Sequence, residues 1–117
     1  ERIGIGSVLL FAELLVALTA IPLIRRRVAP NNRYGLRTAA TLSDDYTWYE
    51  LNVIAGWGLL VASLLNGALT IAWLAGVPGC SLLVVMLSLV VTPLLTTLVC
   101  AQAARRVRRR AGEATMR

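Results

Sequence analysis

Three long runs of apolar residues alternate with short polar segments along the chain. The runs cover residues 3–24, 51–75 and 80–103, and each is long enough for a helix to cross the roughly 30 Å hydrocarbon core of a bilayer. Inside these runs, the one charged side chain is that of Glu13. The pattern predicts an all-α integral membrane protein, a three-helix bundle that forms a single membrane domain over residues 1–117.

The first run could also belong to a signal peptide. It lacks a basic leading region and a small-residue cleavage site, and it ends in Arg25, Arg26 and Arg27. These features favour a spanning helix over a cleaved segment.

Residues 25–50 form a polar connector between the first two runs. Pro30, Asn31 and Gly35 are typical turn residues, and Ser43, followed by two acids, predicts the start of the second helix. That helix should therefore begin before the membrane does, with three aromatic side chains at headgroup level, namely Tyr46, Trp48 and Tyr49.

The second and third runs are separated only by the uncharged turn Gly76-Val77-Pro78-Gly79. Such a short turn predicts an antiparallel helical hairpin. The basic tail, residues 104–117, should be helical at first and frayed after Gly112.

Hydrophobic residues make up 57% of the chain, the net charge is +6, and all 12 basic residues are arginines. Because the arginines flank the apolar runs, the positive-inside rule explains the charge better than binding to nucleic acid, so no nucleic-acid partner is expected. The connector and the C-terminus should be cytoplasmic and the N-terminus outside. The lysine-free composition is typical of a GC-rich bacterial genome, which favours a bacterial inner membrane. Without histidine, and with only two distant cysteines, no zinc site, disulfide framework or cofactor is expected.

Seven residues at the connector and the start of the second run form a spaced motif: Asn32, Gly35, Arg37, Thr38, Trp48, Asn52 and Gly56. This motif resembles that of the SdpI family of bacterial membrane proteins. The resemblance implies a multi-pass membrane protein similar to that family's C-terminal three-helix module. The named member of that family is linked to immunity against a secreted toxin and to signalling, so the resemblance also implies a role of this kind.

The motif residues other than Gly56 are expected to form one packed unit at the cytoplasmic end of the bundle, with Gly35 at positive φ. Arg37 could pair with Asp44 or Asp45, whereas Arg33 needs no role beyond topology.

Glu13, Asn66 and Thr92 are expected at similar depth in the membrane. An ionised carboxylate there costs about 2.5–3.5 kcal/mol or more, so Glu13 should face protein, near Asn66, and be largely neutral. One interpretation is a proton or ligand site shared by the three helices. The other, which we favour, is a neutral carboxyl whose hydrogen bond to Asn66 fixes helix pairing.

Small residues recur every four positions on the third run, at Ser88, Thr92, Thr96 and Cys100. This spacing favours close helix packing. Pro93 removes the hydrogen bond to the carbonyl of Leu89, which predicts a static kink more readily than a hinge.

These features favour a non-catalytic protein that binds another membrane component, either as an immunity-type protein or as an accessory subunit of a larger membrane complex. The expected partners are membrane lipids and another integral membrane protein, and a homo-oligomer is possible. The alternative is a small proton-coupled carrier or channel-like oligomer that uses Glu13. An intramembrane enzyme is not favoured, because the spans contain no paired carboxylates and no nucleophile with a base.

Overall fold

The computed structural model describes residues 1–31, 35 and 44–116. These residues form three helices: α1 (Arg2–Ile24), α2 (Asp45–Leu74) and α3 (Leu82–Met116). Each is long and apolar enough to cross a membrane, and the described residues include no strand. The predicted all-α fold with three spanning helices is therefore confirmed. Five residues discussed above, Asn32, Arg33, Arg37, Thr38 and Ser43, lie outside the described part of the chain.

Helix α1 ends where its backbone turns into the left-handed region at Arg26, which has a φ of 57°. The amides of Arg25 and Arg27 still bond to the carbonyls of Ile21 and Pro22, at 3.0 Å each. The apolar run and the helix therefore stop together, at the first arginines.

Helix α2 begins after Asp44, which is its N-cap. The extended backbone of Asp44 lets its carboxylate accept hydrogen bonds from the Thr47 amide, at 2.7 Å, and from the Thr47 hydroxyl, at 2.9 Å. The prediction that this helix starts at Ser43 is wrong by one residue. A carboxylate one position later reaches the same free amides, and its charge also complements the positive end of the helix.

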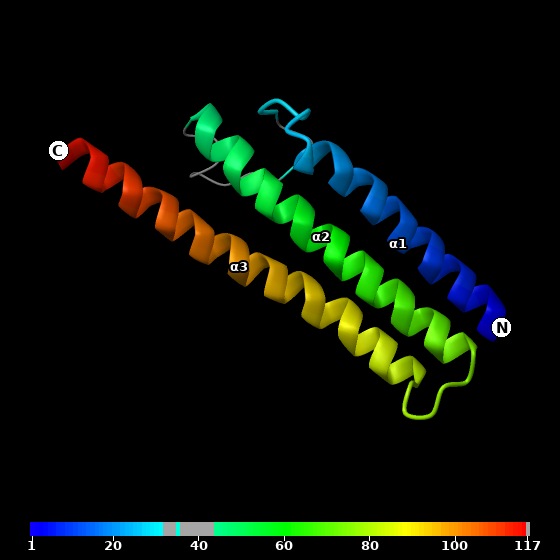
Figure 1. Cartoon of the computed structure of the whole chain (residues 1–117). Helices are drawn as coiled ribbons and strands as arrows, with labels where there is room; N and C mark the ends of the chain where they lie inside the picture. Colours follow the sequence, from blue (N-terminus) through cyan, green and yellow to red (C-terminus); the bar gives the residue numbers. More distant parts are fainter. Residues whose placement is uncertain (32–34, 36–43, 117) are drawn as a thin grey trace.

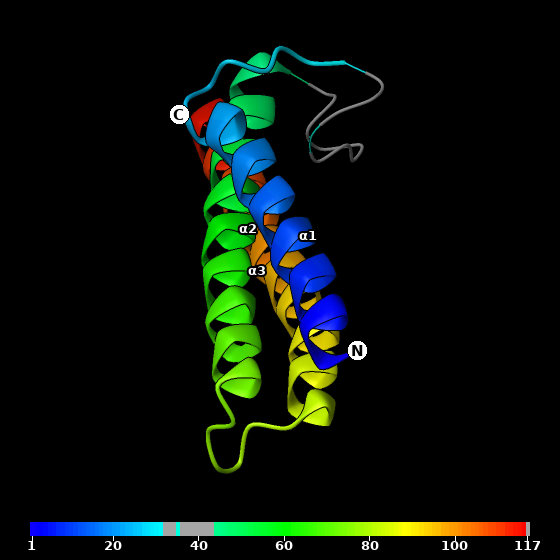
Figure 2. The same cartoon turned by 90° about the vertical axis from the view of Figure 1, so that its right-hand side faces the viewer.

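The C-terminal tail differs from the prediction, because α3 continues through Gly112 to Met116. A helix of this length, about 52 Å at 1.5 Å per residue, exceeds the roughly 30 Å hydrocarbon core. Its basic last turns therefore extend beyond the apolar segment. Both views show them at the same end of the molecule as the connector, with the α2–α3 turn at the other end (Figure 1, Figure 2).

Helix α2 is the centre of the arrangement and lies between α1 and α3 (Figure 1). Both outer helices pack on α2, and they make no close backbone contact with each other. Two glycines explain how α2 receives a helix on each side. A Cβ at Gly56 would stand 3.0 Å from the Ala20 carbonyl of α1, and one at Gly58 would stand 2.6 Å from Cγ2 of Thr96 on α3. Residues two apart on a helix point to nearly opposite faces.

Candidate functional site

The connector end of the bundle brings together three motif residues, Gly35, Trp48 and Asn52. The Trp48 side chain is fully buried, and its indole Nε1 donates to the carbonyl of Val28 at 2.8 Å. Asn52, one turn further along, is 2% exposed and donates through Nδ2 to the Trp48 carbonyl at 2.9 Å. The aromatic that sequence analysis expected at the headgroups is thus a buried link between the connector and α2.

Gly35 lies directly against this pair. Its φ is +101°, which confirms the predicted positive φ. A Cβ at this position would stand 2.8 Å from Oδ1 of Asn52 and 3.3 Å from the Trp48 ring. Both the backbone conformation and the space therefore favour glycine. Whether Asn32, Arg37 and Thr38 complete the unit stays a prediction, because they lie outside the described residues.

An ion pair that sequence analysis missed joins the ends of α1 and α2. Arg26, just after α1, pairs with Glu50 in the second turn of α2. The two side chains are 51% and 32% exposed, so the pair contributes little to stability on its own. It nevertheless links the segment after α1 to the second turn of α2.

A second polar cluster lies at mid-span and includes the three residues predicted to share one depth. Nδ2 of Asn66 donates to Oγ1 of Thr92 at 3.1 Å, which links α2 to α3. The Glu13 carboxyl, on α1, is a hydrogen-bonding neighbour of the Asn66 side chain. All three residues line one cavity of about 160 Å³. The structure therefore brings Glu13, Asn66 and Thr92 together, whatever their role.

The same cavity has lining residues that sequence analysis did not single out as one site. They come from all three helices: Val16 of α1, Leu59, Ala62 and Ser63 of α2, and Leu89, Pro93 and Thr96 of α3. Oδ1 of Asn66 is buried there and has no hydrogen-bond partner among the described residues. A buried acceptor without a donor is uncommon in a folded protein and calls for an explanation.

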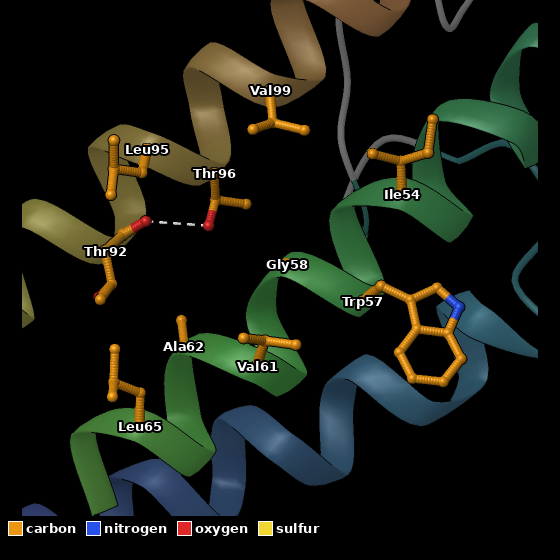
Figure 3. Close-up of a pocket in the computed structure, with 10 residues that line it drawn as sticks. All are labelled: Ile54, Trp57, Gly58, Val61, Ala62, Leu65, Thr92, Leu95, Thr96 and Val99. Carbon is orange, nitrogen blue, oxygen red and sulfur yellow. Dashed lines mark hydrogen bonds between the residues drawn. The ribbon is translucent and has the colours of Figure 1, made fainter.

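A larger groove of about 470 Å³ lies between α2 and α3 (Figure 3). Gly58 and Ala62 are the small residues along its α2 side, with larger apolar side chains such as Trp57, Leu65 and Leu95 around them. The hydroxyl of Thr96 bonds to the Thr92 carbonyl at 2.9 Å, within its own helix (Figure 3). The groove therefore offers an almost wholly apolar surface.

The chemistry available to the site is that of oxygen and amide groups. The described residues contain no cluster of three histidine, cysteine or acidic side chains that could hold a metal ion. Cys80, which precedes α3, and Cys100, within α3, are both free thiols.

A family model described as the SdpI/YfhL protein family matches residues 27–97, which is more than half of the chain. The chain belongs to the SdpI/YfhL family. No curated protein and no solved structure matches it. The SdpI match includes the connector motif, Asn66 and Thr92, but it starts after Glu13. Membership of this membrane family, together with three helices of spanning length, indicates a multi-pass membrane protein.

Proposed function

We propose that this SdpI-family protein acts in the bacterial inner membrane by binding another membrane component, without catalysis. The component is either a membrane-active polypeptide, as for an immunity protein, or a subunit of a larger membrane complex. Membership of the SdpI family supports the first version, because the resemblance implies an immunity-type role.

The observation that supports the proposal best is the groove between α2 and α3. Small residues beneath a rim of large apolar side chains allow a further helix to approach closely. The floor contains Gly58 and Ala62, and the rim contains Trp57, Leu95 and Val99. Lipid chains can cover such a surface, but a helix lying in it would pack against residues 54–65 of α2 and 92–99 of α3 at once.

Photo-crosslinking in the native membrane tests this proposal. A crosslinking side chain at Val61, which lines the groove and is 60% exposed, should give a discrete adduct with one protein. The control is Leu18, which is 53% exposed on α1 and should label lipid. Adducts with lipid alone at both positions would contradict the proposal.

The identity of the crosslinked protein distinguishes the versions of the proposed function. A secreted polypeptide indicates immunity, an integral subunit indicates an accessory role, and a second copy of the chain indicates a homo-oligomer. Val61→Trp should then abolish the adduct formed from a crosslinker at Leu65 without lowering the thermal stability, because it fills the groove from an exposed position.

A second candidate function is a small proton-coupled carrier or channel-like oligomer. It is supported by the position of Glu13 on a cavity inside the span. In liposomes, this function requires a proton flux that Glu13→Gln abolishes while the protein stays folded. Absence of any flux above that of empty liposomes would exclude it.

A further inference from the structure

The mid-span cavity contains more hydrogen-bond acceptors than donors. Three hydroxyl groups line it, and each donates to a carbonyl of its own helix: Ser63 to Leu60, Thr92 to Ser88 and Thr96 to Thr92. Nδ2 of Asn66 donates to Thr92. The described side chains around the cavity therefore have almost no donor left for a further acceptor.

Several acceptors remain. Asn66 is 4% exposed, and its Oδ1 has no partner among the described residues. Glu13 adds its carboxyl oxygens, which share one hydrogen bond with the Asn66 side chain. Pro93 has no amide proton, so the carbonyl of Leu89 loses its helical donor, and both of these residues line the cavity. The acceptors come from α1, α2 and α3.

The charge of the cavity, like its surplus of acceptors, favours a positively charged ligand. Glu13 is acidic, and the cavity's described lining residues include no basic side chain. An ionised carboxylate in hydrocarbon needs a compensating positive charge. A proton on Glu13 can be donated to one acceptor, whereas a metal cation is contacted by several oxygens at once. In membrane transporters, carbonyl groups freed from interrupted helices coordinate such ions.

We propose that this cavity binds a small alkali cation, with the Glu13 carboxylate, Oδ1 of Asn66 and the Leu89 carbonyl as its oxygen ligands. A volume of about 160 Å³ exceeds that of a bare ion. Water molecules, at roughly 30 Å³ each, complete the coordination shell. With the cation bound, Glu13 stays ionised inside the span.

A neighbouring cavity lies on the connector side of the proposed site. This cavity, of about 300 Å³, shares Leu59, Pro93 and Thr96 with the mid-span cavity. It extends to Gly35 in the connector, and polar side chains such as Thr97 line it. This second cavity therefore lies between the proposed site and the connector end of the bundle. This inference does not rest on partner binding, and Glu13 precedes the region that matches the SdpI family.

Thermal unfolding of the purified full chain in lipid nanodiscs tests the site. Unfolding is followed by tryptophan fluorescence in sodium, potassium or choline chloride at equal ionic strength. A ligand that binds only the folded state raises Tm in proportion to the logarithm of its concentration above Kd. We expect sodium or potassium to raise Tm by a few degrees relative to choline, because the methyl groups of choline keep oxygen ligands from coordinating its charge closely.

Three variants make the test specific. Glu13→Gln keeps the side-chain shape and should remove the cation-dependent rise in Tm. Pro93→Ala restores the donor to Leu89 and should raise the apparent Kd for the cation by roughly tenfold, the loss of about one ligand bond. Glu113→Gln, which removes an exposed acid in the tail of α3, should leave the rise unchanged.

The proposal is overturned if Tm is the same in all three salts, or if the rise persists in Glu13→Gln. It is also overturned if acidification alone raises Tm and no cation does, because the cavity then holds only a proton. If Glu13→Gln does not fold, retention of the native Kd by Pro93→Ala overturns the proposed ligand set.

Discussion

The indole of Trp48 is hydrogen-bonded to the carbonyl of Val28, with 2.8 Å between the nitrogen and the oxygen. The two residues are twenty positions apart, and their contact links the segment after α1 to the first turns of α2. Because Trp48 is fully buried, this bond is shielded from water. It therefore positions the connector on the bundle more strongly than an exposed contact would.

Trp48→Phe should destabilise the protein by about 1–3 kcal/mol. The change removes the donor to Val28 and leaves a small void beside Gly35. Thermal unfolding in mild detergent measures the loss. Trp57→Phe is the matched control, because that indole is 53% exposed on the apolar groove and should change Tm little. Equal Tm values for the two variants would show that the buried bond does not stabilise the fold.

Gly35→Ala should destabilise the connector end by about 1–3 kcal/mol, the usual strain of a non-glycine residue in this region. The added methyl group would also meet Asn52 at 2.8 Å. Gly67→Ala serves as the control, since nothing lies within 4 Å of its Cβ position and alanine favours a helix. If Gly35→Ala is as stable as Gly67→Ala, the connector tolerates another conformation at this position.

The spans follow from the sequence because run length and charge determine them almost alone. The first run was predicted to start at Ile3, and α1 is Arg2–Ile24. Details at helix ends depend on local hydrogen bonds. The hydroxyl of Ser81 accepts a bond from the Val84 amide at 3.3 Å, and α3 begins at Leu82 rather than at Cys80.

The shared depth of Asn66 and Thr92 could also be predicted, because residues of an antiparallel hairpin face each other at similar distances from the turn. The pairing of Arg26 with Glu50 could not. It depends on how α1 is rotated and shifted against α2, and a long connector leaves both undetermined. The acceptor surplus around Asn66 was equally hidden, because the destination of each hydroxyl proton depends on side-chain rotamers.

The orientation of the bundle is predicted from the arginines, with the connector in the cytoplasm and the α2–α3 turn outside. In a background without native cysteines, a membrane-impermeant thiol reagent applied to intact cells should label a cysteine at Val77. It should not label one at Ala39 until the cells are opened. Labelling at position 39 and not at position 77 in intact cells would show the opposite topology, with the connector outside.

The last prediction concerns the bond between α1 and α2 at Glu13. Glu13→Gln should keep the helices assembled, because an amide has the same shape and can donate to Oδ1 of Asn66. Glu13→Leu removes every hydrogen-bonding group from that position, and it should destabilise the protein by about 0.5–2 kcal/mol, the range of interhelical bonds in membranes. Unfolding in nanodiscs measures both values.

Ser7→Leu is the control for Glu13→Leu, since the exposed Ser7 hydroxyl bonds only to the Ile3 carbonyl of its own helix. Its Tm should stay close to that of the native protein. If Glu13→Leu is as stable as Ser7→Leu, the carboxyl does not hold α1 to α2. If Glu13→Gln is less stable than the native protein in sodium but equally stable in choline, the carboxylate acts through the cation. A structural hydrogen bond and ion binding thus predict different orders of thermal stability for the same variants, because a neutral amide replaces a hydrogen bond but not a charge.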